Sequence, residues 1–439
     1  LNWLSNLSDP FVDAPVVRPP SGMLGFFRYF LAPVRGLLAW LVVVSLIASL
    51  SELALFVFLG QLVDLTTDNP SPGTFFSDNA WLLTGMAFVL LVVRPVSVLL
   101  SRALTTVSFV PSLTALVRWR SYRYVLRQSL SFFQNDFAGR IVTKVWSAGQ
   151  ATGDLMTSLL QVAWFMLIYT VSTMTLVGQL DWRLALVVGV WVVIFALLAR
   201  YFVPRIRRHA RETAEAGSML NGRLVDSFGN VQTLKLFGRE DENDSYIRSG
   251  FDRFQATLRP FARLLTGVRS SLALLSGIMI TTIAYLSVDL WLSGAITAGG
   301  VAFTLGLVLR LNMLLGRMMT QLNGIMRNIG TIQNSAELIS QPIGLTDKAD
   351  AKPLNVERAA IEFDHVSFGY DHGLPVLDAL TLKVAAGEKV GIVGRSGAGK
   401  STMVNLLLRF YDVDSGRILI DGQNIAEITQ ASLRRNIGM

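Results

Sequence analysis

Six apolar stretches, each near the length that crosses a lipid bilayer, constrain this chain more than any other feature. A transmembrane helix needs about 20 apolar residues, and only helices and closed barrels pair all of their backbone polar groups within the hydrocarbon layer. The stretches are Leu37–Gly60, Trp81–Leu100, Leu155–Leu180, Leu184–Val203, Leu264–Val288 and Ile296–Leu315. The sequence therefore predicts an all-α membrane domain with six transmembrane helices.

The charges between these spans predict their orientation. Residues 61–80 and 289–295 carry no Lys or Arg, whereas residues 101–152 and 204–263 carry basic clusters. Basic loops stay in the cytoplasm, so both termini and the two long loops are predicted on the cytoplasmic side of a multi-pass protein of the cytoplasmic (inner) membrane. The long loops mix apolar and charged residues with few Gly or Pro, which favours helices that continue beyond the membrane.

Composition agrees with a membrane protein and excludes several kinds of chemistry. Apolar residues make up 51% of the chain and charged residues only 16%, against about 25% charged residues in soluble domains. The net charge of +8 lies largely beside the spans, which indicates contact with membrane lipid rather than nucleic acid. Because there is no Cys, disulfides and thiolate metal sites are excluded. His209, His365 and His372 lack metal-ligand spacing.

The regions outside the spans predict four segments. Gly22–Leu31 is apolar and aromatic with one Arg, which favours a short helix in the membrane interface. After the sixth span a helical pattern continues to Ile339, and a polar linker follows. Strand-like alternation over residues 360–368 then begins a soluble domain. The predicted division is residues 1–35 with the interfacial helix, 36–340 as the membrane domain, 341–357 as the linker, and 358–439 as the first part of a nucleotide-binding domain.

A phosphate-binding motif lies in that last segment. It fits G-x-x-x-x-G-K-[ST], with the apolar run 390–393 before it as a predicted strand and residues 403–408 after it as a predicted helix. Backbone N–H groups of such a loop surround phosphate oxygens, Lys400 reaches the β- and γ-phosphates, and Ser401 can hold Mg²⁺. The candidate ligand-binding residues are Gly394, Arg395, Ser396, Gly397, Ala398, Gly399, Lys400, Ser401 and Thr402. We expect the incomplete α/β P-loop fold that this pattern defines.

Taken together, six spans, two long cytoplasmic helical loops and a P-loop domain resemble a half-size ABC exporter of the multidrug or lipid type. Residues 366–370 are similar to the family segment whose aromatic side chain stacks on adenine, which places that role on Tyr370. Residues 378–390, 414–422 and 433–438 also resemble the family's nucleotide-binding domain. Residues 131–140 and 234–240 resemble the cytoplasmic loops that contact that domain.

The resemblance implies ATP and Mg²⁺ as cofactors and a dimer, with a second copy or a related half-transporter as partner. The complete protein would be an ATPase that exports hydrophobic or amphipathic compounds. The family's signature motif, Walker B Asp, catalytic Glu and switch His all fall beyond residue 439, so no catalytic residue is assigned in this chain. As a C-terminally truncated chain, it is expected to bind nucleotide weakly and not to turn it over.

Two other functions fit parts of the pattern. One is a non-transporting, ATP-gated membrane regulator on the same scaffold. The other is a membrane-tethered P-loop kinase or GTPase, against which the segment around Tyr370 argues.

Three charged residues interrupt the apolar spans, namely Glu52, Arg94 and Arg310. Charges inside a membrane are costly and usually mark a cavity or a partner. Counting 1.5 Å per residue puts both arginines roughly 20 Å from the outer face and Glu52 roughly 10 Å away from them in depth. One hypothesis is a positive cavity for acidic compounds or lipid head groups. The alternative is arginines that snorkel to the interface or pair within the bundle.

Overall fold

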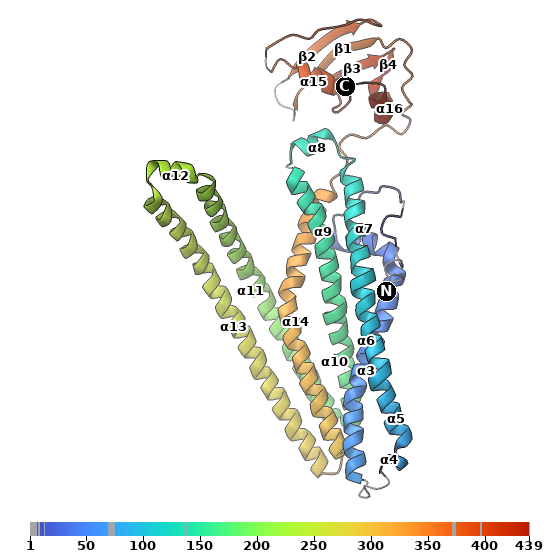
Figure 1. Ribbon diagram of the computed structural model, residues 1–439, viewed down its shortest axis with the longest axis vertical. Helices are drawn as coiled ribbons and strands as arrows, with labels where there is room; N and C mark the ends of the chain where they lie inside the picture. The colour runs from blue at the N-terminus through green and yellow to red at the C-terminus, as the bar shows by residue number, and fades with distance from the viewer. Residues whose placement is uncertain are drawn as a thin grey trace. The chain divides into compact units, whose positions relative to one another are not determined.

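The computed structural model describes residues 7, 9–12, 14–68, 75–136, 138–370, 375–395 and 397–438, and at 240, 315, 317–320 and 323 it describes the backbone alone. The chain divides into two compact units (Figure 1). The helical unit comprises residues 1–10, 31–114 and 150–331. The mixed unit comprises residues 11–30, 115–149 and 332–439.

Long helices make up the helical unit, and three of them continue into the mixed unit. A π-helical segment interrupts the second predicted span at Val89–Val93 and another interrupts the third at Leu159–Trp164, while a further one, Leu104–Phe109, follows the second span. The helices are α3 (Arg35–Asp68), α4 (Phe75–Asp78), α5 (Ala80–Phe88), α6 (Arg94–Ala103), α7 (Val110–Val125), α9 (Ala138–Ser158), α10 (Phe165–Leu180), α11 (Trp182–Gly229), α12 (Val231–Phe237), α13 (Glu240–Leu292) and α14 (Ala298–Ile339). The helical prediction for the spans and for the long loops is confirmed.

Five helical runs are long and apolar enough to cross a membrane, among the residues searched. They are 23–67, 80–125, 138–180, 182–229 and 241–292. The sixth predicted span lies in α14, where the apolar stretch Ala298–Leu314 is shorter. Side chains of this unit pack around a core that includes Tyr169, Leu184, Ile283, Leu307 and Leu311, all of them buried.

Helices α11 and α13 pack along each other and are joined by α12, so they form one long hairpin (Figure 1). The hairpin begins at Asp181, whose extended backbone stops α10 and whose carboxylate accepts a hydrogen bond of 2.7 Å from the backbone N–H of Arg183. Such an N-cap satisfies one of the free N–H groups at a helix start. It explains how Asp181, the one residue between α10 and α11, suffices to reverse the chain there.

A second carboxylate fixes α14 against α3. Asp64 accepts hydrogen bonds of 2.7 Å from the backbone N–H of Gly299 and 2.8 Å from the Thr297 hydroxyl. A Cβ at position 299 would lie 2.0 Å from the carbonyl oxygen of Gly60, so only glycine allows this approach. The first turn of α14 is therefore capped by α3, and the two helices are held in one register.

In the mixed unit, short helices and a small sheet join the ends of α7, α9 and α14. The short helices are α2 (Met23–Leu31), α8 (Leu130–Gln134), α15 (Lys400–Leu407) and α16 (Gln430–Arg435). The antiparallel sheet has the order β2-β1-β3-β4, with β1 Ile361–Phe368, β2 Leu377–Val384, β3 Ser415–Ile420 and β4 Gln423–Asn424. The predicted helix near residues 22–31 is confirmed as α2, and its Phe26 and Phe30 are buried within the protein.

Hydrogen bonds fix both ends of the linker in this unit. At its start, the carbonyl oxygen of Gln341 accepts bonds from the Tyr124 hydroxyl and from the Gln128 amide, at 2.7 and 2.9 Å. At its end, the Asp421 carboxylate accepts four bonds from the backbone N–H groups of residues 357–360. These bonds, that of Arg358 foremost, lower the pKa of the Asp421 carboxyl far below its usual range because they stabilise the anion.

The strand predicted at residues 390–393 is not formed. Residues 388–395 have no regular structure, and the side chains of Val390, Ile392 and Val393 are exposed, Val393 to 93%. A strand needs a neighbouring strand for its backbone groups, and the described sheet pairs only β1 to β4 with one another. The apolar run is therefore present without the partners that would bury it.

Candidate nucleotide site and membrane pocket

The phosphate-binding loop lies between residues 394 and 399, at the start of α15. The ammonium of Lys400 donates hydrogen bonds to the carbonyl oxygens of Gly394 and Arg395, at 2.7 and 2.9 Å. The loop therefore curls around its own lysine and keeps a positive charge at its centre. Ser396, which was predicted to belong to the loop, lies outside the described residues.

Gly399 allows the turn that leads from the loop into α15. Its backbone is left-handed, with φ +82°, and Gly397 has φ +87°. A Cβ on Gly399 would lie 2.9 Å from Leu377, at the start of β2. A residue with a side chain would be strained by the backbone angle and would also meet β2. Both features explain why the motif needs glycine here.

The N-terminus of α15 is open towards the loop. Its N-cap residue is Gly399, and no described side chain caps it, so its first N–H groups and the positive end of the helix dipole can receive an anion. Ser401 is exposed and Thr402 is buried. The structure thus brings together Gly394, Arg395, Gly397, Ala398, Gly399, Lys400, Ser401 and Thr402, in an arrangement that fits a phosphate group.

Tyr370 lies beside this loop. Its hydroxyl is 3.2 Å from the hydroxyl of Thr402, and its ring packs edge-on against Phe368 and Tyr411 with centroids 5.0 and 5.3 Å away. Tyr370 is 39% exposed, so the described residues do not enclose it, and an aromatic ring can stack on a planar ligand. The sequence-based placement of Tyr370 near the phosphate loop therefore fits the geometry.

Tyr411, which the sequence did not single out, connects the aromatic group to α8. Its hydroxyl donates a hydrogen bond to the side-chain oxygen of Gln134, the last residue of α8. Helix α8 includes Ser131–Phe133, part of the segment predicted to contact the nucleotide-binding domain. The only feature of the sequence that could have pointed to Tyr411 is its aromatic side chain, placed shortly after the helix that follows the phosphate loop.

In the helical unit, the structure pairs two of the three charges in the spans. The Arg310 guanidinium donates a hydrogen bond to the Glu52 carboxylate, and these side chains are 22% and 14% exposed. The estimate that Glu52 lies about 10 Å from Arg310 in depth is therefore wrong. It counted from assumed span ends, whereas α3 continues to Asp68 and the Asp64 cap sets the register with α14. Glu52 is 12 residues before Asp64, and Arg310 is 11 after Gly299.

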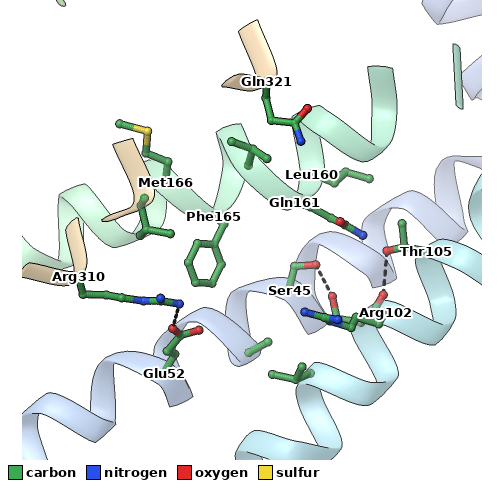
Figure 2. A pocket seen from close by; sticks show the side chains of 15 residues that line it. Ser45, Glu52, Arg102, Thr105, Leu160, Gln161, Phe165, Met166, Arg310 and Gln321 are labelled. Atoms are coloured by element: carbon green, nitrogen blue, oxygen red, sulfur yellow. Dashed lines mark hydrogen bonds and ion pairs between the residues drawn. The ribbon is translucent and has the colours of Figure 1, made fainter. Parts of the chain in front are cut away.

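A pocket of about 360 Å³ lies beside this ion pair (Figure 2). Residues of α3, α6, α10, α14 and two π-helical segments line it, among them Glu52 and Arg310. Arg94 is not one of the lining residues, although it begins α6. The sequence placed Arg94 and Arg310 together, and the structure instead brings Arg102 to the pocket. Arg102 was counted only as a loop charge because it follows the predicted second span.

Comparisons with known proteins place the chain in a family. The model of the ABC transporter transmembrane region matches residues 38–315, and the ABC transporter model matches residues 377–439. A Haemophilus influenzae protein, named as an uncharacterized ABC transporter ATP-binding protein, is 33% identical over 447 residues. That alignment covers 100% of this chain and 71% of the relative. The chain belongs to the ABC transporter family.

Relatives with more specific names match a smaller share. YgaD of Bacillus subtilis and a Staphylococcus aureus protein, both named for multidrug export as ATP-binding/permease proteins, are 28% and 29% identical. Each alignment covers 74% of this chain and 56% of the relative. A solved structure of a bacterial Atm1-family ABC exporter with ATP bound has a TM-score of 0.74 and 24% identity, over 92% of this chain and 71% of that one. The exporter fold is thereby shown.

Proposed function

We propose that this chain forms the membrane domain and the first part of the ATP-binding domain of an exporter that uses ATP to move hydrophobic or amphipathic compounds out of the cytoplasm. The observation that carries the proposal is the presence, in one chain, of a phosphate-binding loop and of a membrane pocket with both charged and apolar walls. The names of the relatives from Bacillus and Staphylococcus support export rather than another use of the scaffold.

Transport by the full-length protein in liposomes tests this proposal. ATP-dependent accumulation of a fluorescent amphiphile in liposomes, with the ATP-binding domains outside, would support export. Hydrolysis of ATP without movement of any compound would favour a non-transporting regulator on the same scaffold.

The nucleotide is proposed to be MgATP. Lys400 and the N-terminus of α15 would hold the phosphates, and the exposed hydroxyl of Ser401 would be a ligand of Mg²⁺. When bound, Mg²⁺ would neutralise charge on the terminal phosphates. Tyr370 would stack on the adenine, which agrees with its partly exposed ring beside Thr402.

Replacing Tyr370 by Ala is expected to weaken binding of ATP by about tenfold, because base stacking on an aromatic ring is worth about 1–3 kcal/mol. Binding of inorganic triphosphate, which has no base, should change much less. Titration of both ligands against the purified protein measures the difference. An equal loss for both ligands would mean that Tyr370 supports the fold of the loop and does not recognise the base.

A second copy of the chain, or a related half-transporter, is the proposed partner. Around α12 the side chains of Phe228, Leu236 and Phe237 are each at least 68% exposed. Several large apolar side chains at the tip of a hairpin form an unsatisfied surface that another chain can cover. One phosphate-binding loop per chain also agrees with two copies per transporter.

The proposed location is the cytoplasmic membrane, with both termini and the tip of the α11–α13 hairpin in the cytoplasm. Cysteine substitutions test this orientation on a chain that has no Cys of its own. Asp68→Cys and Ser293→Cys are expected to react with an impermeant maleimide added to intact cells, whereas Arg123→Cys and Arg208→Cys should react only after lysis. The reverse pattern would contradict the six-span topology.

A further inference from the structure

The pocket in the helical unit combines charged and apolar walls inside the bundle. Figure 2 shows the Glu52–Arg310 pair on one side and Arg102, with Ser45 and Thr105, on the other, with the ring of Phe165 between them. Its volume of about 360 Å³ lies within the range of small-molecule sites. Both ends are polar, so a molecule that fills the pocket must satisfy polar groups as well as contact apolar ones.

The charges of the pocket leave one cation without a counter-charge. Arg310 is neutralised by Glu52. Arg102 also lines the pocket, and among the described residues it has no acidic partner within 4.0 Å. The hydroxyls near Arg102 are already engaged, since Ser45 and Ser101 bond to each other at 2.9 Å and Thr105 bonds to the carbonyl of Ser101 at 2.8 Å. The described lining therefore has a net positive charge, and its source is Arg102.

Two π-helical segments present further groups to the pocket. Thr105 belongs to Leu104–Phe109, and Gln161 belongs to Leu159–Trp164. A π-helical turn contains one extra residue and changes the direction of side chains around it, and such turns often occur at functional sites. Gln161 thereby reaches the pocket as a neutral group that can both donate and accept hydrogen bonds.

Apolar side chains form the rest of the wall. Phe165, Met166 and Leu314 are among the lining residues, and Figure 2 shows the ring of Phe165 between the two charged ends. An aromatic ring and a flexible thioether adapt to apolar bodies of different shapes. This wall can contact the apolar part of an amphipathic ligand. A small inorganic anion has no apolar part and would leave the wall without a contact.

We infer that this pocket binds an amphipathic molecule that carries a single anionic group, with Arg102 contacting the anion and the wall around Phe165 contacting the apolar body. The importance of this site for transport rests on the proposed export function, but the binding itself does not. Arg102 follows the cytoplasmic end of the predicted second span, so the anion lies towards the cytoplasm and the apolar body lies deeper in the membrane.

The test uses three probes that share one fluorophore and differ in charge. They are dansylglycine (anionic), dansylamide (neutral) and dansylcadaverine (cationic), titrated against the full chain in phosphatidylcholine nanodiscs without ATP. We expect dansylglycine to bind about tenfold more tightly than dansylamide, since a hydrogen bond between charged groups adds about 1.5 kcal/mol or more. Dansylcadaverine should bind more weakly than either.

Arg102 and Arg94 both belong to α6, so substitutions at these two positions form a matched pair. Arg102→Gln should remove the preference for dansylglycine and leave the affinity for dansylamide unchanged, and Arg102→Lys should retain most of the preference. Arg94→Gln, eight residues away on α6 but outside the pocket, should leave all three affinities as in the parent. Equal affinities of the parent for the three probes, or equal effects of Arg102→Gln and Arg94→Gln, would overturn the inference.

The same assay separates the two sources of such a ligand. Dansylglycine is titrated again in nanodiscs that contain phosphatidylglycerol. Displacement of the probe would assign the site to an anionic lipid head group, whereas unchanged binding would assign it to a free amphiphile, and either result supports the anion site. Transport in liposomes is measured independently, so a protein that binds dansylglycine but moves no compound would contradict only the proposed export function.

Discussion

Substituting Lys400 by Ala is expected to reduce the affinity for MgATP on the order of 100-fold, the largest effect that any single change in the loop should have. The ammonium of Lys400 is held at the centre of the loop by the carbonyls of Gly394 and Arg395. When MgATP binds, phosphate oxygens would accept hydrogen bonds from Lys400, either in place of these two carbonyls or together with them. Hydrogen bonds between charged groups contribute about 1.5–3 kcal/mol each, and a loss of about 3 kcal/mol corresponds to roughly 100-fold in affinity.

Lys389 provides the control for this experiment. It is an exposed lysine five residues before the motif, so Lys389→Ala changes the net charge of the domain equally without touching the loop. Titration with MgATP should show parent-like affinity for this variant. Because Lys400 also bonds to its own loop, thermal unfolding without nucleotide should be recorded for both variants. Binding of MgATP by Lys400→Ala within threefold of the parent would show that the loop is not the nucleotide site.

The sequence predicted most of the helical architecture because the bilayer leaves few alternatives. A stretch such as Leu184–Val203 has to be helical in lipid, and α11 contains it. The charged extension of the same helix to Gly229 was also predictable, because its pattern has few helix breakers. Likewise, the motif predicted a helix after the loop, and α15 begins directly after the left-handed turn at Gly399, which depends on local sterics.

Features that depend on distant partners were not predictable in this way. The apolar run before the loop predicted a strand, but a strand forms only where another strand pairs with it, and residues 388–395 have no such neighbour in the described sheet. The contact between Glu52 and Arg310 depends on the register of α3 and α14, which a single cap at Asp64 sets. Arg102 lines the pocket only because of how α3, α6, α10 and α14 pack.

The ion pair between Glu52 and Arg310 leads to the second large expected effect. Removing one partner of a fully buried pair leaves an uncompensated charge and typically costs about 3–5 kcal/mol, whereas replacing both by neutral residues of similar volume costs little. Glu52 and Arg310 are partly buried, so much of this cost is expected here. Glu52→Gln is therefore expected to lower the unfolding midpoint strongly. The double variant Glu52→Gln/Arg310→Met should regain most of the loss. Thermal unfolding in detergent, followed by circular dichroism, measures both.

An exposed pair on α11 is the matched control. The carboxylate of Glu212 lies 2.9 Å from the guanidinium of Arg208, and these side chains are 40% and 80% exposed. Water screens such exposed pairs, and they contribute little to stability, so Glu212→Gln should leave the midpoint nearly unchanged. If Glu52→Gln were as mild as this control, Arg310 would have to find another counter-charge or reach water. If the double variant were as unstable as Glu52→Gln, the pair would be needed for packing rather than for charge balance. Only a strong single effect with recovery in the double variant agrees with a partly buried ion pair whose role is to neutralise Arg310 beside the pocket. In that case Arg102 is the cation that a ligand meets.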